Sequence, residues 1–462
     1  MRRLLTLTAL ALALLPATAQ AEEVLTYRYG PIAIGPYQVN LRELVADLPK
    51  PQVDGYLTGM EANIVDADGT PVPISRVMLH HVVFGNLGRR VGERKDAMCD
   101  RITMLDNRTA YPAYAERFFG VGEERVAGRL PDGYGYPVKG ADRWMATWML
   151  MNHRNRPDSV YLEYKVRYET QRALTPVQLL WADVRNCNYD PVYDVPGGGR
   201  PGSTHTDSRT FTMPYSGRIV TGVGHVHGGG KEVEVSQPDC GNRTLVRSRA
   251  TWARAHDPEY RVRPLVHEPG PIDMDVVQSA RGIPVAAGER LRLSSRYDAR
   301  LPHTRVMGIM GLFVARDPGV TRPCGELPGD IRVLRDSRPG RVRTPLVRVP
   351  INARRGPSAV ATPIVRPPSL PTWTSGAPLD VRNLFVEPGN AVVRQGATVR
   401  WRFWGSTLHT VTVASGPQGF SSPNLSDGRS FSHRFTRPGT YKLYCSLHPV
   451  DMPSTVRVLP AR

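Results

Sequence analysis

Four side chains that bind soft metals lie close together near the end of the chain. Cys445, His448 and Met452 fall within eight residues, and His409 follows a strand-like run upstream. Sulfur ligands favour Cu(I), imidazoles also bind Cu(II), and one Cys with two His in a trigonal plane and a weak axial Met forms a blue-copper site. The residue types and their order therefore predict a bound copper that passes single electrons.

The elements that would position these ligands follow one another in the sequence. Residues 383–386 and 396–401 are strand-like runs, and Pro438-Gly439-Thr440-Tyr441 turns the chain toward the ligand loop. With its Cys-x2-His-x3-Met motif, the segment 379–462 resembles a plastocyanin- or amicyanin-type cupredoxin. The resemblance implies a Greek-key β-sandwich with His409, Cys445, His448 and Met452 as the copper ligands. The gap of three residues before Met452 lies between the gaps of two and four that are common in that family.

Two further histidine pairs lie in apolar, strand-like segments. His80 and His81 are adjacent within residues 77–84, whereas His225 and His227 form a His-x-His pair. Alternate residues of a strand share a face, so a His-x-His pair can chelate one metal. Adjacent residues point to opposite faces, so His80 and His81 can share a metal only where a bulge or strand end redirects one of them. Otherwise one would be a core histidine and the other a surface histidine.

Residues of about 55 to 316 resemble the core of the copper monooxygenases that include peptidylglycine α-hydroxylating and dopamine β-monooxygenases. In that family two jelly-roll-like β-sandwiches each hold one copper, and the coppers use O2 to hydroxylate a C–H bond. The ligands that the resemblance implies are His80, His81 and His153 for a first copper and His225, His227 and Met307 for a second.

Two positions depart from the pattern of that family. In that family, the third histidine of the first copper site aligns with the strand-like run 161–168, where this chain has Arg167. His153, which follows the preceding apolar run, is therefore assigned as the third ligand. Peptide-amidating members carry an Arg two residues before His-x-His to hold the substrate carboxylate, and this chain has Val223 there. A peptide carboxylate is therefore not the expected substrate. The other histidines stand alone and are expected at the surface or in hydrogen bonds: His205, His256, His267, His303 and His433.

The composition of the whole chain favours an all-β fold. Its 462 residues include 43 Gly and 42 Pro, and many short alternating runs stand beside few long helical patterns. We predict two jelly-roll-like β-sandwich domains, then a linker, then a cupredoxin Greek-key β-sandwich. The predicted division is 1–21 for a signal peptide, 22–195 and 196–320 for the sandwiches, 321–378 for a basic Pro-rich linker and 379–462 for the cupredoxin.

The first residues predict export from the cytoplasm. A basic start, an apolar run over 4–16 and Ala19-Gln20-Ala21 are typical of a secretory signal peptide cleaved after Ala21. That apolar run is shorter than the ~20 residues needed to span a membrane. We therefore expect a secreted or periplasmic protein without a transmembrane segment in its mature form.

The cysteines agree with an oxidising compartment. Cys445 is assigned to copper, which leaves an even number, four, for disulfide bonds. The pairs Cys99–Cys187 and Cys240–Cys324 are our prediction, although three connectivities are open from the sequence.

The charge and motifs limit the partners and functions. The formal net charge is +18, yet no nucleic-acid recognition motif is present and export argues against such a partner. A redox partner, a small reductant or an anionic cell-envelope surface fits better. A multicopper oxidase would need several His-x-His motifs and a His-Cys-His segment. The chain has one His-x-His motif and no His-Cys-His segment. The sequence leaves two functions open: a copper-dependent monooxygenase fed by a blue-copper domain, or a non-enzymatic copper-binding electron shuttle.

Overall fold

A computed structural model describes residues 22–90, 92–99, 102–105, 110–185, 187, 191–254, 267–335 and 378–462. None of these residues lies in an α-helix, and the only helical turn among them is the 3-10 turn Pro238–Cys240. The predicted all-β class is therefore confirmed. No helix in the described part of the chain is long and apolar enough to cross a membrane. The predicted signal peptide lies outside the described residues.

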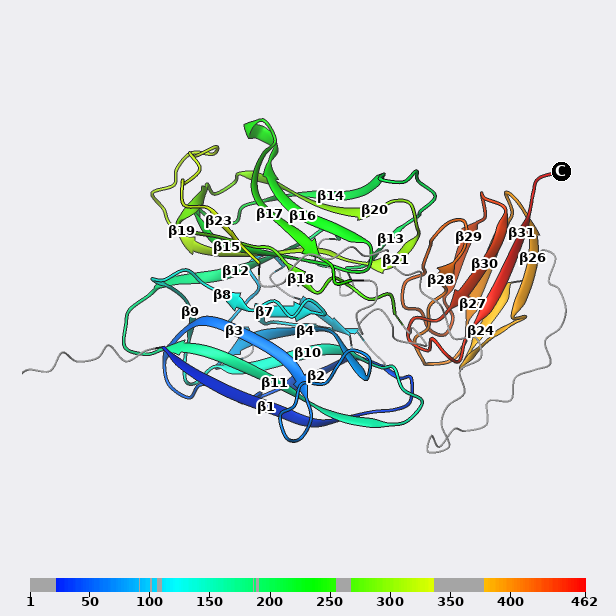
Figure 1. The fold of residues 1–462 in the computed structure, drawn as a ribbon, viewed down its shortest axis with the longest axis horizontal. Coiled ribbons are helices and arrows are strands. Elements are labelled where there is room, and N and C mark those ends of the chain that lie inside the picture. The colour runs from blue at the N-terminus through cyan, green and yellow to red at the C-terminus, as the bar shows by residue number, and fades with distance from the viewer. Residues whose placement is uncertain are drawn as a thin grey trace, which may run out of the picture.

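Two facing sheets form the first sandwich (Figure 1). One contains β1 (Glu23–Ile34), β11 (Asp158–Glu169), β3 (Gly55–Val65), β8 (Gly128–Arg129) and β9 (Tyr134–Val138); the other contains β2 (Val39–Ala46), β10 (Arg143–Asn152), β4 (Val77–Gly88) and β7 (Glu116–Gly122). Every second residue of β11 from Val160 to Val166 is buried, as expected for a strand with one face on a core. Trp144, Trp148 and Phe84 fill the space between the sheets.

The first sheet continues into the second sandwich, because β9 pairs in parallel with β12 (Thr175–Asp183). The following strands of this sheet are β22 (Gly308–Arg316), β15 (Gly217–Val226), β19 (Val276–Val285) and β23 (Arg332–Leu334). The facing sheet contains β14 (Thr204–Thr212), β20 (Arg290–Asp298), β16 (Gly230–Gln237), β17 (Arg243–Thr251) and β18 (Asp273–Met274). Two short pairs complete this part: β13 (Tyr193–Val195) with β21 (His303–Val306), and β5 (Ile102–Leu105) with β6 (Ala110–Ala113).

Residues 378–462, here called the C-terminal unit, form a separate small sandwich. Its sheets are β25 (Phe385–Glu387), β24 (Leu379–Arg382), β27 (Thr398–Phe403) and β29 (Ser430–Arg434), facing β26 (Asn390–Arg394), β31 (Ser454–Leu459), β30 (Gly439–Tyr444) and β28 (Thr412–Ser415). Trp401, Phe403, Phe435 and Tyr441 are buried between them. In Figure 1 the unit, drawn in orange and red, lies beside the end of the second sandwich that carries β13 and β21.

Both predicted disulfides are confirmed. Cys99 is bonded to Cys187 and Cys240 to Cys324, and Cys445 is a buried free cysteine. Of the segment predicted as a linker, residues 336–377 lie outside the described part. Its first residues include β23, which pairs with β19.

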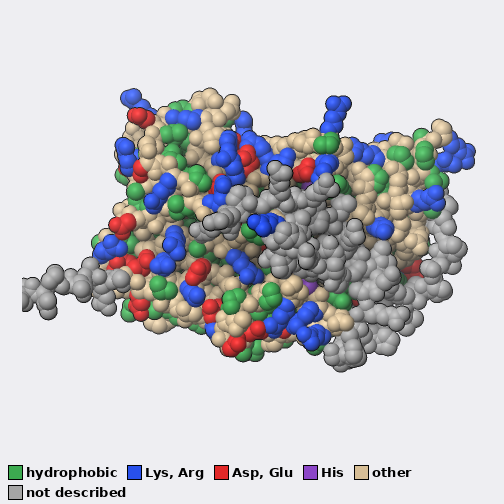
Figure 2. All heavy atoms as spheres, viewed as in Figure 1, with side chains coloured by type: hydrophobic (Ala, Val, Ile, Leu, Met, Phe, Trp, Pro, Cys, Tyr) green, Lys and Arg blue, Asp and Glu red, His purple; other side chains and the backbone are tan. Residues whose placement is uncertain are grey.

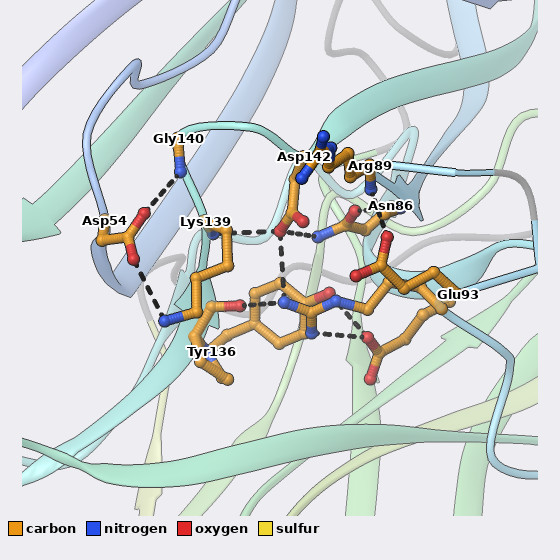
Figure 3. A network of polar contacts seen from close by, with 12 residues as sticks. Asp54, Asn86, Arg89, Glu93, Tyr136, Lys139, Gly140 and Asp142 are labelled. Carbon is orange, nitrogen blue, oxygen red and sulfur yellow. Dashed lines mark hydrogen bonds and ion pairs between the residues drawn. The ribbon is translucent and has the colours of Figure 1, made fainter.

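A buried polar network closes one edge of the first sandwich at the β9–β10 turn (Figure 3). Asp142 accepts hydrogen bonds from Asn86 Nδ2 at 2.9 Å and from the backbone N–H of Lys139 at 3.0 Å. Arg94 bridges Asp142 and Glu116, at 3.1 Å from each carboxylate. Because these charges are paired and hydrogen-bonded, none of the buried carboxylates in the network is left uncompensated. On the face drawn in Figure 2, Lys and Arg are scattered among other side chains over both sandwiches.

Candidate metal centres

The C-terminal unit brings three of its predicted ligands to one point. Cys445 directly follows β30, and Cys445 Sγ lies 3.5 Å from His448 Nδ1 and 3.9 Å from His409 Nδ1. Ligands on one metal at ~2.0 and ~2.3 Å, about 120° apart, would be separated by roughly 3.7 Å. The three side chains therefore have the spacing of a trigonal metal site.

Local backbone bonds hold these ligands in place. The backbone of His409 pairs with Leu425 through two hydrogen bonds of 2.8 and 2.9 Å, and the His448 N–H donates to the Cys445 carbonyl at 3.1 Å. Met452, whose N–H donates to the His448 carbonyl, is 1% exposed and packs in the same cluster as Cys445. His409 is fully buried, whereas His448 is half-buried, so the site opens to its surroundings through His448.

The surroundings of the sulfur favour a thiolate. Thr410 donates its backbone N–H to Cys445 Sγ at 3.3 Å. Burial raises the pKa of the Cys445 thiol, but hydrogen bonds and charges from His409 and His448 outweigh it and hold this pKa well below its ordinary value. A buried thiolate with two imidazoles and a nearby thioether is the donor set of a blue-copper site.

A second group of histidines lies where the two large sandwiches meet. Ring nitrogens of His80, His227 and His267 all lie within 4.8 Å of one another, so these residues could hold a metal ion. His80 comes from β4, His227 directly follows β15, and His267 lies in the segment before β18. His80 Nε2 is 3.1 Å from His267 Nε2, and the rings of His80 and His227 lie edge to face at 4.6 Å.

A bulge turns His80 inward. On β10, Met149 pairs with His81 and the next residue, Leu150, pairs with Leu79, so His80 is the extra residue of β4. Such an irregularity is what adjacent histidines need if both are to reach one point. His80 is 2% exposed and its Nδ1 lies 2.8 Å from His81 Nδ1, whereas His81 is half-buried.

In His227 and in His267, a hydrogen bond at Nδ1 fixes the orientation of the ring and so the direction of Nε2. His227 Nδ1 lies 3.0 Å from the Arg305 carbonyl, and His267 Nδ1 lies 2.6 Å from the Glu268 carbonyl. Burial, and then neighbouring histidines, lower the pKa of His80 and His227 well below the ordinary value, and burial lowers that of His267 to about 4. These rings are therefore neutral near pH 7, which is the form that binds metals.

The other predicted ligands occupy several places. His225 lies beside His227, with ring centroids 5.1 Å apart, and its Nδ1 pairs with Glu124 at 3.0 Å. His153 is buried, donates its backbone N–H to the Arg76 carbonyl and is not a member of the converging group. Met307 is buried between β21 and β22, where its carbonyl accepts a hydrogen bond from Tyr297.

The expectation that His267 stands alone is wrong, because this residue converges with His80 and His227. No sequence signal marks it, since its neighbours show no periodic pattern. His303, expected at the surface or in a hydrogen bond, is buried and pairs through Nδ1 with the Glu268 carboxylate at 2.9 Å, as the second of these expectations has it. Glu268 also explains why residue 228 is a glycine, because a Cβ on Gly228 would lie 2.3 Å from Glu268 Cγ.

A small cavity lies next to the histidine group. Its volume is about 40 Å³, and His225 and Glu124 form its polar end. The side chains of Phe119, Trp181 and Phe313 are among its apolar walls. A space of this size holds a molecule of only a few atoms, whereas sites for organic ligands usually measure ~300 Å³ or more.

The C-terminal unit is held against the second sandwich by specific bonds. Asp194 of β13 accepts hydrogen bonds from Ser421 N at 2.6 Å and Ser421 Oγ at 2.8 Å, and from Arg305 N at 2.9 Å. The Arg305 guanidinium donates to the Ser422 carbonyl at 3.2 Å. Arg305 therefore contacts the C-terminal unit through its side chain and His227 through its carbonyl.

A second contact joins the loop of the predicted ligands, residues 445–452, to the first sandwich. Val450, between His448 and Met452, packs with Val39, Met78 and Met151. The loop that carries the predicted C-terminal ligands is thus apposed to the first sandwich.

Comparisons with known proteins give two separate similarities. A family model described as stress up-regulated Nod 19 matches residues 149–317, which is less than half of the chain. Among solved structures, a purple cupredoxin from Nitrosopumilus maritimus is similar at 30% identity over 18% of this chain and 100% of its own, with a TM-score of 0.17. Reduced and oxidised amicyanin variants are similar at 27% and 26% identity over 18% of this chain and 79% of theirs, each with a TM-score of 0.17. No curated protein matches the chain.

Proposed function

We propose that the C-terminal unit binds one type 1 copper and passes single electrons. The ligands are His409, Cys445 and His448, with Met452 as the axial ligand. The convergence of Cys445 Sγ with two ring nitrogens at 3.5 and 3.9 Å carries this proposal. Copper bound there supplies a one-electron couple between Cu(I) and Cu(II).

The residues around this site have defined roles in the proposal. The Thr410 N–H stabilises negative charge on the sulfur and so adjusts the reduction potential. The buried ring of His409 keeps water away, while half-buried His448 is the edge through which electrons enter or leave.

The whole chain is then an exported copper protein in which the blue-copper unit serves a copper monooxygenase-like core. In this proposal the core holds one or two further coppers and oxidises a C–H bond with O2. Support comes from the histidines gathered between the sandwiches and from the apolar cavity beside His225, whose volume suits a molecule as small as O2. Two disulfides agree with an extracytoplasmic location. A small reductant or a redox partner would supply electrons, and an anionic cell-envelope surface would attract the net charge of +18.

The second candidate is a non-enzymatic electron shuttle or copper-binding protein of the cell envelope. The small volume of the cavity beside His225 favours it, because about 40 Å³ is far below the ~300 Å³ that is usual for sites of organic ligands. Oxygen uptake with ascorbate separates the two functions. Copper-dependent uptake with one of a panel of substrates supports the monooxygenase, whereas none with the blue colour intact supports the shuttle.

The variant Cys445→Ser tests the blue-copper site in the full chain. The intense visible absorption of the Cu–thiolate bond should disappear, while the thermal unfolding of the large sandwiches stays unchanged. Ser432→Ala, at an exposed position of β29 in the same unit, is the control and should keep the band. A band that persists in Cys445→Ser would show that this sulfur is not a ligand.

A further inference from the structure

The geometry points to one copper site, made of His80, His227 and His267, that joins the two large sandwiches. This inference deepens the proposed function of the core and rests on it. It replaces the two separate ligand sets that the sequence predicts with one composite set. Each sandwich contributes a histidine, and the segment before β18 contributes the third.

The spacing of the nitrogens fits a shared metal. Two nitrogens each ~2.0–2.1 Å from one metal, at angles of 90–109°, lie about 2.9–3.4 Å apart. His80 Nε2 and His267 Nε2 are 3.1 Å apart. The ring centroid of His80 lies 4.6 Å from that of His227 and 4.3 Å from that of His267, and one ligand nitrogen of each residue lies within 4.8 Å of the others.

A count of protons argues against a group held by hydrogen bonds alone. His227 Nδ1 and His267 Nδ1 face carbonyl oxygens, so each carries the ring proton and each Nε2 is a lone pair. His80 can donate only one proton from its own Nε2, and that nitrogen already faces His267. In the described part of the chain His227 Nε2 is buried without a hydrogen-bond partner, which is costly. A cation at the common point satisfies these lone pairs.

The contacts of Arg305 favour copper over a redox-inert metal. Its carbonyl orients His227, and its guanidinium reaches Ser422, whose hydroxyl accepts the N–H of Val411 at 2.9 Å. Val411 is bonded to Thr410, which donates to Cys445 Sγ. The two metal sites are therefore linked by hydrogen bonds and a few residues. Imidazoles bind copper well in both oxidation states.

The electron balance of this arrangement is simple. One electron leaves Cu(I) at the Cys445 site, which becomes Cu(II), and reduces Cu(II) at the composite site to Cu(I). A small external reductant of the ascorbate class returns the first site to Cu(I). No bond to carbon forms or breaks in this step.

The backbone conformation of Arg305 fits its contacts at this junction. Its backbone has a φ of +54°, which is unusual for a residue with a side chain. This conformation presents its N–H to Asp194 and its carbonyl to His227. Contacts on both sides offset the strain, as is common at functional sites.

The test is the copper content and the electron paramagnetic resonance spectrum of the full chain after copper loading and dialysis. Two coppers are expected, one blue and one with the non-blue spectrum of nitrogen ligation. His267→Ala should hold only the blue copper. His153→Ala, Met307→Ala and the control His205→Ala should keep both.

Several outcomes would overturn this inference without touching the blue-copper site. The first is a wild-type protein that binds three coppers, and the second is a wild-type protein that binds the blue copper alone. The third is a folded His267→Ala protein that keeps the non-blue copper. Should His267→Ala not fold, His267→Gln is measured instead, because its side chain keeps a polar group at this position. Loss of the blue band in the wild type would instead refute the proposed function.

Discussion

The contacts of Asp194 predict that one carboxylate controls the docking of the C-terminal unit. Its carboxylate accepts hydrogen bonds from three groups, and two of them, the N–H and the hydroxyl of Ser421, donate across the junction at 2.6 and 2.8 Å. The variant Asp194→Ala removes both bonds to Ser421 as well as the bond from Arg305 N, and it leaves Ser421 N without its acceptor. Further contacts remain, because Gly419 N donates to the Pro196 carbonyl at 2.8 Å and Thr304 Oγ1 donates to the Val413 carbonyl at 3.2 Å.

The size of the effect follows from the type of bond. A hydrogen bond to a charged group contributes about 1.5–3 kcal/mol. Two such bonds that share one carboxylate are not additive, so a loss of about 3 kcal/mol is a fair expectation. At 1.4 kcal/mol per factor of ten, the docking equilibrium should shift by on the order of 100-fold. The ratio of undocked to docked molecules should rise by the same factor.

Two assays report docking independently. Small-angle X-ray scattering should show a larger radius of gyration for Asp194→Ala, and the electron transfer between the two copper sites after pulsed reduction should slow. The blue band should be unchanged, because Asp194 contacts none of the ligands. Asp239→Ala is the matched control, since it removes an exposed pairing with Arg290 elsewhere in the second sandwich. An unchanged radius and an unchanged rate in Asp194→Ala would refute the assigned role.

Two further predictions concern stability. Replacing Cys240 and Cys324 by Ser removes a bond that closes 84 residues, which should lower the free energy of unfolding by about 4.5 kcal/mol, as measured with denaturant; an equally stable variant would contradict the assigned bond. Burial raises the pKa of Glu123 to about 8, so the folded protein keeps a proton that the unfolded chain releases near pH 4.5. Stability should fall as pH rises between these values, by up to about 5 kcal/mol, and Glu123→Gln should flatten this slope. If the stability of the wild type and of Glu123→Gln changed with pH in parallel, the raised pKa of Glu123 would be contradicted.

The sequence was most informative where ligands are close in the chain. Cys445 and His448 are three residues apart after a strand, so local backbone geometry alone brings them together. His409 is distant in the sequence, and it was assigned as a ligand from the resemblance to cupredoxins. The pairing of the four other cysteines was predicted correctly, but the sequence alone left three connectivities open.

The histidine group of the core could be predicted only in part. The pairs His80-His81 and His225-x-His227 are visible as motifs, and a bulge was named as a requirement for the first. Which member turns inward depends on how β10 pairs with β4, and the sequence does not encode that register in any local signal. His267 joins the group through long-range packing of a segment without a pattern, so no spacing rule could have assigned it.

The position of Arg305 has a thermodynamic consequence that ties these results together. Its N–H donates to Asp194 and its guanidinium to the Ser422 carbonyl of the C-terminal unit, while its carbonyl orients His227. Docking and copper binding at the composite site must then share a coupling free energy, and such coupling is reciprocal. The Asp194→Ala protein should therefore bind the non-blue copper more weakly, although Asp194 does not touch that site. Equal affinity in wild type and variant would mean that the two sites are neighbours without being coupled.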